Sequence, residues 1–134
     1  MAIHYETKAT NVGGRKGHVY TDDRALDIDI VPPAQADGKA TNPEQLFAAG
    51  YASCFNGAVQ HMIKEAGMTA ESTVKARVSL YNLDDGGYQI GVVLEVHIDG
   101  ISEEEAQKIA EDAHEFCPYS KATRGNIDVE VTIV

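Results

Sequence analysis

Apolar and polar residues alternate with a period of two along the N-terminal part of the chain. The clearest case is Leu26, Ile28 and Ile30, which alternate with Asp27 and Asp29 and would place one face of a strand on a core. Patterns of this kind predict strands over residues 3–10, 17–21 and 25–31. Gly13, Gly14 and Gly17 indicate the turn of the first hairpin.

The pattern changes at Thr41, where a long helix is predicted to begin. Thr41 or Asn42 can cap its N-terminus, and Pro43 suits a first turn, where no backbone N–H is needed. We expect the helix to run to about Ala66 and to end at Gly67. Nearly all of its positions are apolar, which predicts burial either inside the domain or against a second chain.

Alternation returns over residues 72–83 and 87–98, and it predicts a long hairpin with its turn at Asp84–Gly87. A second helix opens with the capping box Ser102–Glu105, carries one apolar stripe, and ends near Cys117. Strands and helices in this order indicate an α+β fold.

The C-terminal residues 127–134 alternate once more and predict a final strand. No internal repeat or low-complexity linker divides the chain, so residues 1–134 are interpreted as a single domain.

Composition limits the possible partners. The 134 residues are 43% hydrophobic and 24% charged, which is typical of a globular protein and not of a disordered one. The formal net charge is −10 and the 11 Lys and Arg are scattered, so nucleic acid is not expected as a partner. No apolar stretch reaches the ~18 residues that a membrane span needs. We therefore expect no membrane association and a cytoplasmic location.

Two cysteines are the strongest candidates for chemistry. Two are too few for a disulfide framework, and a reducing cytosol disfavours a standing bond between Cys54 and Cys117 while allowing a transient catalytic one. Cys54 is either a small buried hydrophobe or a nucleophile. The second interpretation requires a nearby cation that favours the thiolate.

Arg15 and Glu44 each have two interpretations. Arg15, in the turn Gly13–Gly17, is either a solvated hairpin arginine or part of a loop that folds over a site. Glu44 either interacts favourably with the helix dipole in the first turn or orients an arginine through a bidentate pair. The histidines have no zinc-ligand spacing beyond His114 and Cys117, so no metal site is expected.

Read together, Thr41–Phe55 and Cys117–Asn126 resemble the segments around the peroxidatic and resolving cysteines of the organic hydroperoxide resistance (Ohr) branch of the OsmC/Ohr superfamily, a group of thiol-dependent peroxidases. Arg15 matches the family's glycine-flanked arginine loop. The resemblance covers nearly the whole chain. It implies antiparallel sheets packed on a buried central helix, in an intertwined homodimer.

The resemblance also implies roles for four residues. Cys54 would attack the peroxide, Cys117 would convert the sulfenic acid to a disulfide, and Arg15 and Glu44 would hold the thiolate. The implied substrates are alkyl and fatty-acid hydroperoxides. No cofactor would be bound, and the reductant would be an external dithiol, the dihydrolipoyl group of a lipoylated protein.

Two alternatives to this function stay open. The chain could be a peroxidase of the OsmC branch with broader substrates, or a non-catalytic hydrophobic-ligand binder or thiol sensor on the same fold. One geometric difficulty is also visible. Glu44 and Cys54 are ten residues apart, a rise of ~15 Å on a straight helix. Either the helix is broken near Gly50, or the glutamate comes from the partner chain, which we favour.

Overall fold

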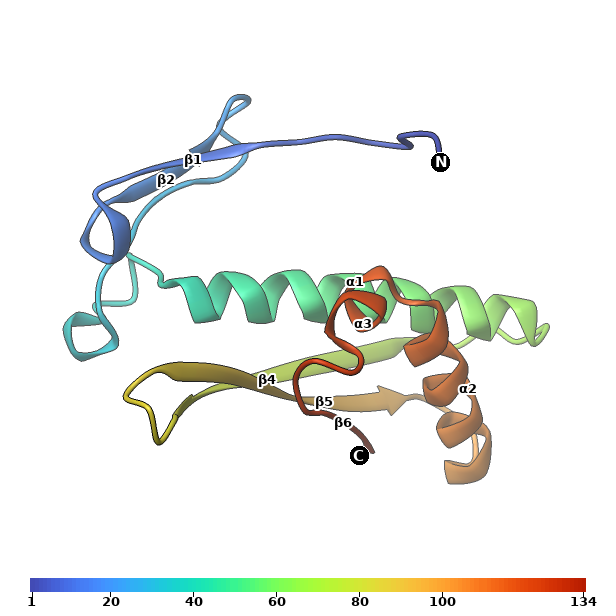
Figure 1. The fold of residues 1–134 in the computed structure, drawn as a ribbon. Helices are drawn as coiled ribbons and strands as arrows, with labels where there is room; N and C mark the ends of the chain where they lie inside the picture. Colours follow the sequence, from blue (N-terminus) through green and yellow to red (C-terminus); the bar gives the residue numbers. More distant parts are fainter. The chain divides into compact units, whose positions relative to one another are not determined.

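Six strands, three α-helices and two short 3₁₀ turns make up the chain, in an order that confirms the α+β class (Figure 1). The computed structural model describes residues 1–134. They form two compact units, residues 1–46 and 47–134, each described below by itself. The prediction that the whole chain acts as a single domain stays a prediction. No helix is long and apolar enough to cross a membrane.

The first unit contains a small antiparallel sheet in the order β1-β2-β3, with strands β1 (Ala9–Val12), β2 (His18–Thr21) and β3 (Asp27–Asp29). A 3₁₀ turn, Gly14–Lys16, joins the first two strands, and a second one, Pro33–Gln35, follows the sheet. All three strands were predicted, and β2 has nearly its expected bounds.

The expected strand over residues 3–10 is wrong for most of its length. The ladder between β1 and β2 begins where Ala9 pairs with Thr21, so the residues before Ala9 have no partner strand in this sheet. Alternation in the sequence marks a segment suited to a strand, but only pairing makes one.

Helix α1 (Pro43–Glu65) has the predicted bounds to within a residue or two. Asn42 is the cap, because its side-chain oxygen accepts a hydrogen bond from the backbone N–H of Gln45 at 2.8 Å. At the other end Gly67 has a φ of 72°, and the N–H of Met68 bonds to the carbonyl of Ile63 at 3.1 Å, as in a Schellman ending. Glycine adopts this conformation without strain.

The second unit has a three-stranded sheet, order β4-β5-β6, from strands β4 (Ser72–Asn82), β5 (Tyr88–Ile98) and β6 (Val129–Ile133). The predicted hairpin β4–β5 is confirmed. The expected antiparallel pairing holds for the first sheet and for β4–β5, and one pair departs from it, because β6 pairs with β5 in parallel. Parallel neighbours need a crossover connection, and helices α2 (Glu103–Phe116) and α3 (Pro118–Thr123) supply it.

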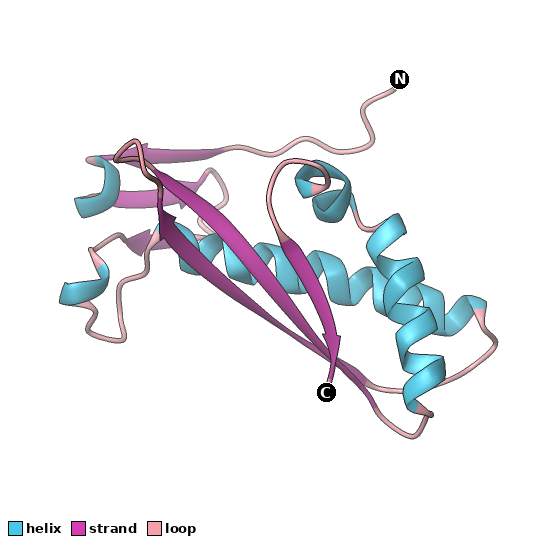
Figure 2. Ribbon diagram, turned by 60° about the horizontal axis from the view of Figure 1, so that its bottom comes forward, coloured by secondary structure: helices cyan, strands magenta, loops and turns pink.

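One face of this sheet packs against helices. Figure 2 shows the long strands of the sheet crossing α1 obliquely, with α2 crossing α1 near the C-terminal end of that helix. Alternate residues of β5 form a core with the buried faces of α1 and α2. The core includes Val92, Leu94, Val96 and Ile98 of β5, Tyr51, Phe55, Val59 and Ile63 of α1, and Ile109 and Ala113 of α2. The helix α1 is not buried all round within this chain, since Ala49, Ser53, Gly57 and Gln60 are exposed along its other side.

Candidate functional site

The first unit holds the predicted arginine–glutamate pair. Arg15 donates from Nη2 to Oε1 of Glu44 at 2.8 Å and from Nη1 to Oε2 at 3.1 Å. This bidentate geometry fixes both the position and the plane of the guanidinium. The arginine's hydrogen bond lowers the pKa of the Glu44 carboxyl, so the pair is ionised at neutral pH. The Arg15 side chain is 58% exposed, which leaves one side of it free to meet an anion.

The glycines around Arg15 shape its turn. Gly13 has a φ of 88°, and a side chain at Gly17 would lie 1.7 Å from the carbonyl oxygen of Val12, so no other residue fits there. Asn11 completes the turn: its Oδ1 accepts the N–H of Gly14 at 2.9 Å, and its Nδ2 donates to two backbone carbonyls. Asn11 was not predicted as part of the turn, although an Asn two residues before a Gly-Gly pair is a recognisable turn signal.

The second unit brings the two cysteines together. The sulfur atoms of Cys54, on α1, and Cys117, between α2 and α3, lie 3.5 Å apart, and both are free thiols. A disulfide needs ~2.05 Å, so a small movement would join them. Cys54 is partly exposed, whereas Cys117 has no exposed surface. A solute can therefore reach Cys54 first.

The surroundings of Cys54 decide its protonation. Burial raises the pKa of the Cys54 thiol; a hydrogen bond from the backbone N–H of Tyr119 opposes the rise, and the neighbouring Cys117 adds to it. None of these groups of the second unit is a cation. The thiolate, which is the reactive form, is thus disfavoured by its own unit and requires a positive charge from elsewhere.

A buried hydrogen-bond network lies beside the cysteine pair. The hydroxyl of Ser120 bonds to the Tyr51 hydroxyl at 2.9 Å and to Nδ1 of His114 at 2.8 Å, and Tyr51 also bonds to Thr123 at 3.1 Å. Burial lowers the pKa of His114, and the charge of Arg124 adds to the effect, so its ring is neutral at neutral pH. These polar side chains were assigned no role in the predicted site, because α3 was not predicted.

Aromatic rings line α1 near Cys54. Tyr119 packs over Gly50, where an added Cβ would lie 3.0 Å from the tyrosine hydroxyl. The ring centroid of Tyr119 lies 5.7 Å from that of Tyr51 and 6.5 Å from that of Phe47. Tyr51 is fully buried, whereas Phe47 and Tyr119 are partly exposed and form an apolar surface within about one to two helical turns of the thiol.

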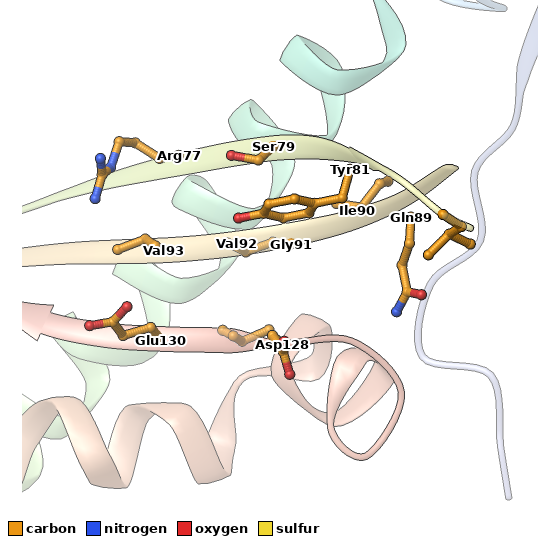
Figure 3. Close-up of a pocket in the computed structure, with 12 residues that line it drawn as sticks. Arg77, Ser79, Tyr81, Gln89, Ile90, Gly91, Val92, Val93, Asp128 and Glu130 are labelled. Atoms are coloured by element: carbon orange, nitrogen blue, oxygen red, sulfur yellow. The ribbon is translucent and has the colours of Figure 1, made fainter. Parts of the chain in front are cut away.

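A groove of about 520 Å³ lies on the opposite face of the β4–β5–β6 sheet. Figure 3 shows Arg77, Ser79 and Tyr81 on β4 above Gly91 and Val93 on β5. It contains no thiol, and Arg77 is paired with Glu95 at 3.4 Å. The groove is therefore not part of the thiol site. No group of three or more His, Cys, Asp and Glu side chains is arranged to hold a metal ion.

The four predicted site residues thus form two pairs, one in each unit. Within each pair the contact is direct. Helix α1 continues without a break through Gly50, so the explanation that the helix is broken there is wrong. The alternative, a glutamate from a second chain, stays a prediction.

Three comparisons extend these observations. The family model described as OsmC-like protein matches residues 36–132. A Staphylococcus aureus protein named organic hydroperoxide resistance protein-like is 65% identical over 136 residues, which span 99% of this chain and 97% of its own.

Solved structures agree. The organic hydroperoxide resistance protein OhrB of Bacillus subtilis is 50% identical, with a TM-score of 0.92 over 97% of this chain and 98% of its own. An organic hydroperoxide resistance protein from Elizabethkingia anophelis is 43% identical, with a TM-score of 0.91 over 99% and 98% of the two chains.

Proposed function

Since this chain belongs to the OsmC family and, within it, to the organic hydroperoxide resistance proteins, we propose that it is a thiol peroxidase that reduces organic hydroperoxides to alcohols. The observation that carries the proposal is the pair of free thiols 3.5 Å apart, one partly exposed and one fully buried. A sulfenic acid formed on the exposed cysteine has its resolving thiol already within attacking distance.

The reaction has two steps. The Cys54 thiolate attacks the O–O bond, takes one oxygen as a sulfenic acid, and releases the alcohol after one proton is added. The Cys117 sulfur then attacks the Cys54 sulfur, the S–O bond breaks, and the oxygen leaves as water with the proton of the Cys117 thiol. The product is a Cys54–Cys117 disulfide.

The thiolate needs a cation, and Arg15 is the best candidate. Its guanidinium is fixed by Glu44 and has an open side. We propose that this pair serves Cys54 across a homodimer. The exposed stripe Ala49, Ser53 and Gly57 on α1 supports a dimer, because small side chains let two helices approach closely.

The proposed substrates are alkyl and fatty-acid hydroperoxides. The partly exposed apolar side chains of Phe47 and Tyr119 favour an alkyl chain, which gains ~0.8 kcal/mol for each buried CH₂. Hydrogen peroxide has no such group to bury. For reduction of the disulfide we propose an external dithiol, the dihydrolipoyl group of a lipoylated protein, since no cofactor is needed for thiol exchange. The expected cytoplasmic location stays a prediction.

Replacing each cysteine by serine tests the proposal. Cys54→Ser should abolish reduction of cumene hydroperoxide with a dithiol reductant, because the attacking thiolate is gone. Without added thiol, Cys117→Ser should reduce about one equivalent of peroxide per chain and stop at the sulfenic acid, whereas the wild type should stop at the Cys54–Cys117 disulfide. Alcohol production by chromatography and mass spectrometry of unreduced peptides give the readouts.

Normal turnover by Cys54→Ser would falsify the proposal. Wild-type protein that is oxidised once but is not turned over by any dithiol would instead support the thiol-sensor alternative. A comparable rate with hydrogen peroxide would point to the broader specificity of the OsmC-branch alternative.

A further inference from the structure

Closing the Cys54–Cys117 disulfide requires that the two sulfur atoms are held close together, and the cysteine side chains alone do not fix that distance. Attack on a sulfenic sulfur is fast when the two reacting atoms are held at ~3–3.5 Å in the right direction. The Sγ atoms of Cys54 and Cys117 are 3.5 Å apart in the free-thiol state. A cysteine has a single side-chain torsion before sulfur, so the backbone at residue 117 decides where its sulfur lies.

That backbone forms a corner. Cys117 is at once the residue that ends α2 and the residue that precedes α3, with its N–H bonded to the carbonyl of Ala113 at 2.8 Å and its own carbonyl bonded to the N–H of Lys121 at 3.0 Å. These bonds fix the corner to its own two helices. They do not fix it to α1, which carries Cys54.

The hydroxyl of Ser120 provides that link. It bonds to Tyr51 of α1 at 2.9 Å and to His114 of α2 at 2.8 Å, so one atom joins all three helices. A hydroxyl offers one donor and two acceptor sites, enough for both contacts. Ser120 has no exposed surface, so water cannot replace either partner.

The link lies close to both sulfur atoms along the chain. Tyr51 precedes Cys54 by three residues on α1, and Ser120 follows Cys117 by three residues. Residues three apart on a helix share a face, so each end of the Tyr51–Ser120 bond is about one turn from a reacting thiol. The rings of His114 and Phe55, with centroids 6.2 Å apart, add an aromatic contact between α2 and α1.

We propose that Ser120 is a positioning residue, whose hydroxyl between Tyr51 and His114 holds Cys117 at attacking distance from Cys54 and thereby sets the rate of disulfide closure. The proposal rests on the proposed peroxidase function for its biological meaning. The closure itself can be measured without any peroxide.

The test uses the full-length protein and a symmetric aromatic disulfide whose thiolate is coloured. The Cys54 thiolate attacks the reagent, forms a mixed disulfide and releases one coloured thiolate. Cys117 then attacks the Cys54 sulfur, closes the protein disulfide and releases the second. The two phases of colour separate the reactivity of Cys54 from the positioning of Cys117.

Ser120→Ala and Tyr51→Phe should slow the second phase about tenfold or more, because a looser corner lowers the effective concentration of the thiol. The rate of the first phase should stay within about twofold of the wild type, since the reagent reacts with Cys54 before Cys117 takes part. The matched control is Ser72→Ala, which removes a hydroxyl that bonds to Asn56 and Gln60 of α1 at 2.5 Å each, away from the corner.

An unchanged second phase in Tyr51→Phe would overturn the proposal. Equal slowing of the second phase in Ser72→Ala would also overturn it, because any loosening of α1 would then have the same effect.

Tyr51→Phe keeps the volume of the ring, so it replaces Ser120→Ala if that variant does not fold, but it also removes the bond from Tyr51 to Thr123. Thr123→Val removes that second bond and keeps Ser120, so it should leave the second phase within about twofold; slowing equal to that of Tyr51→Phe would assign the effect to Thr123 and overturn the proposal. A wild-type protein that closes its disulfide with the reagent but does not reduce organic hydroperoxides would refute the peroxidase and leave the positioning role standing.

Discussion

The protonation of Cys54 is the question that matters most at the scale of single residues. Burial raises the pKa of its thiol, and the backbone N–H of Tyr119 is the one group of its own unit that acts in the other direction. A backbone dipole is a weak substitute for a full charge at short range. The proposed peroxidase therefore depends on a cation brought to the thiol by assembly.

We predict that Arg15→Ala moves the pH midpoint of Cys54 alkylation upward and slows the reaction with cumene hydroperoxide about tenfold at neutral pH, because loss of the cation reduces the thiolate fraction. Arg15→Lys should recover only part of the rate, since an ammonium lacks the bidentate fork to Glu44. Rates of iodoacetamide modification against pH provide the measurement.

Lys16→Ala is the matched control, because Lys16 is a cation in the same 3₁₀ turn. It should leave the alkylation profile in place. If the profile of Arg15→Ala overlays that of the wild type, another charge activates the thiol, and Arg124 would be the next candidate.

At the scale of elements, the smaller sheet carries a pH-sensitive cross-strand cluster. His18 on β2 lies directly opposite Asp29 on β3, with 2.7 Å between Nδ1 and Oδ1, and its Nε2 contacts Asp27. The hydrogen bond to Asp29, followed by that to Asp27, raises the pKa of His18. The two strands are short, so this cluster adds a cross-strand interaction to a small number of backbone pairs.

The raised pKa predicts how the stability of β2–β3 depends on pH. A group whose pKa is higher in the folded state stabilises that state fully below its unfolded value of ~6.5, and the stabilisation is lost as pH rises through the folded value. Backbone hydrogen exchange at Val19 and Ile28, corrected for the intrinsic rate, should therefore show protection that declines across that interval.

His18→Gln should have lower protection than the wild type at low pH, and the difference should narrow as the pH rises. His4→Gln, which changes a histidine outside the sheets, serves as the control and should track the wild type. A difference between His18→Gln and the wild type that does not change with pH would show that the ring acts by packing and not by charge.

At the scale of the whole molecule, the chain on its own does not explain how Glu44 could serve Cys54. Both residues lie on the unbroken helix α1, ten residues apart, which corresponds to a rise of ~15 Å. The bidentate pair keeps Arg15 with Glu44. A homodimer in which the pair of one chain faces the thiol of the other removes the difficulty.

A mixed dimer of Glu44→Ala and Cys54→Ser chains tests this arrangement. The one remaining Cys54 belongs to the Glu44→Ala chain, and the intact Glu44 belongs to the other. If the glutamate acts across the dimer, the activity per remaining thiol should be close to that of the wild type. Tandem purification with two different tags isolates the mixed dimer, and peroxide consumption gives the activity.

The Glu44→Ala homodimer is the reference for that experiment. Activity of the mixed dimer no higher than this reference would place the glutamate in the same chain as its thiol. A protein that sediments as a monomer at micromolar concentration and is still fully active would remove the need for a dimer altogether.

Elements with a strong local signal could be predicted from the sequence. Helix α1, the β4–β5 hairpin and the capped start of α2 agree with prediction, because periodicity, caps and turn residues act between neighbours along the chain. Helix α3 was missed, since its six residues are too few to show a period. The parallel pairing of β6 was missed because alternation does not reveal strand direction.

For the candidate site, the sequence by itself determined the residue types: two cysteines, a glycine-flanked arginine and a glutamate in a first helical turn. Their chemistry depends on identity and short spacing, and both can be read along the chain. Only the tertiary structure decided that the two sulfur atoms lie 3.5 Å apart and that the Ser120 hydroxyl joins α3 to α1 and α2. The Cys54–Cys117 and Tyr51–Ser120 contacts join residues more than sixty positions apart, and their formation depends on how whole elements pack, which no local pattern encodes.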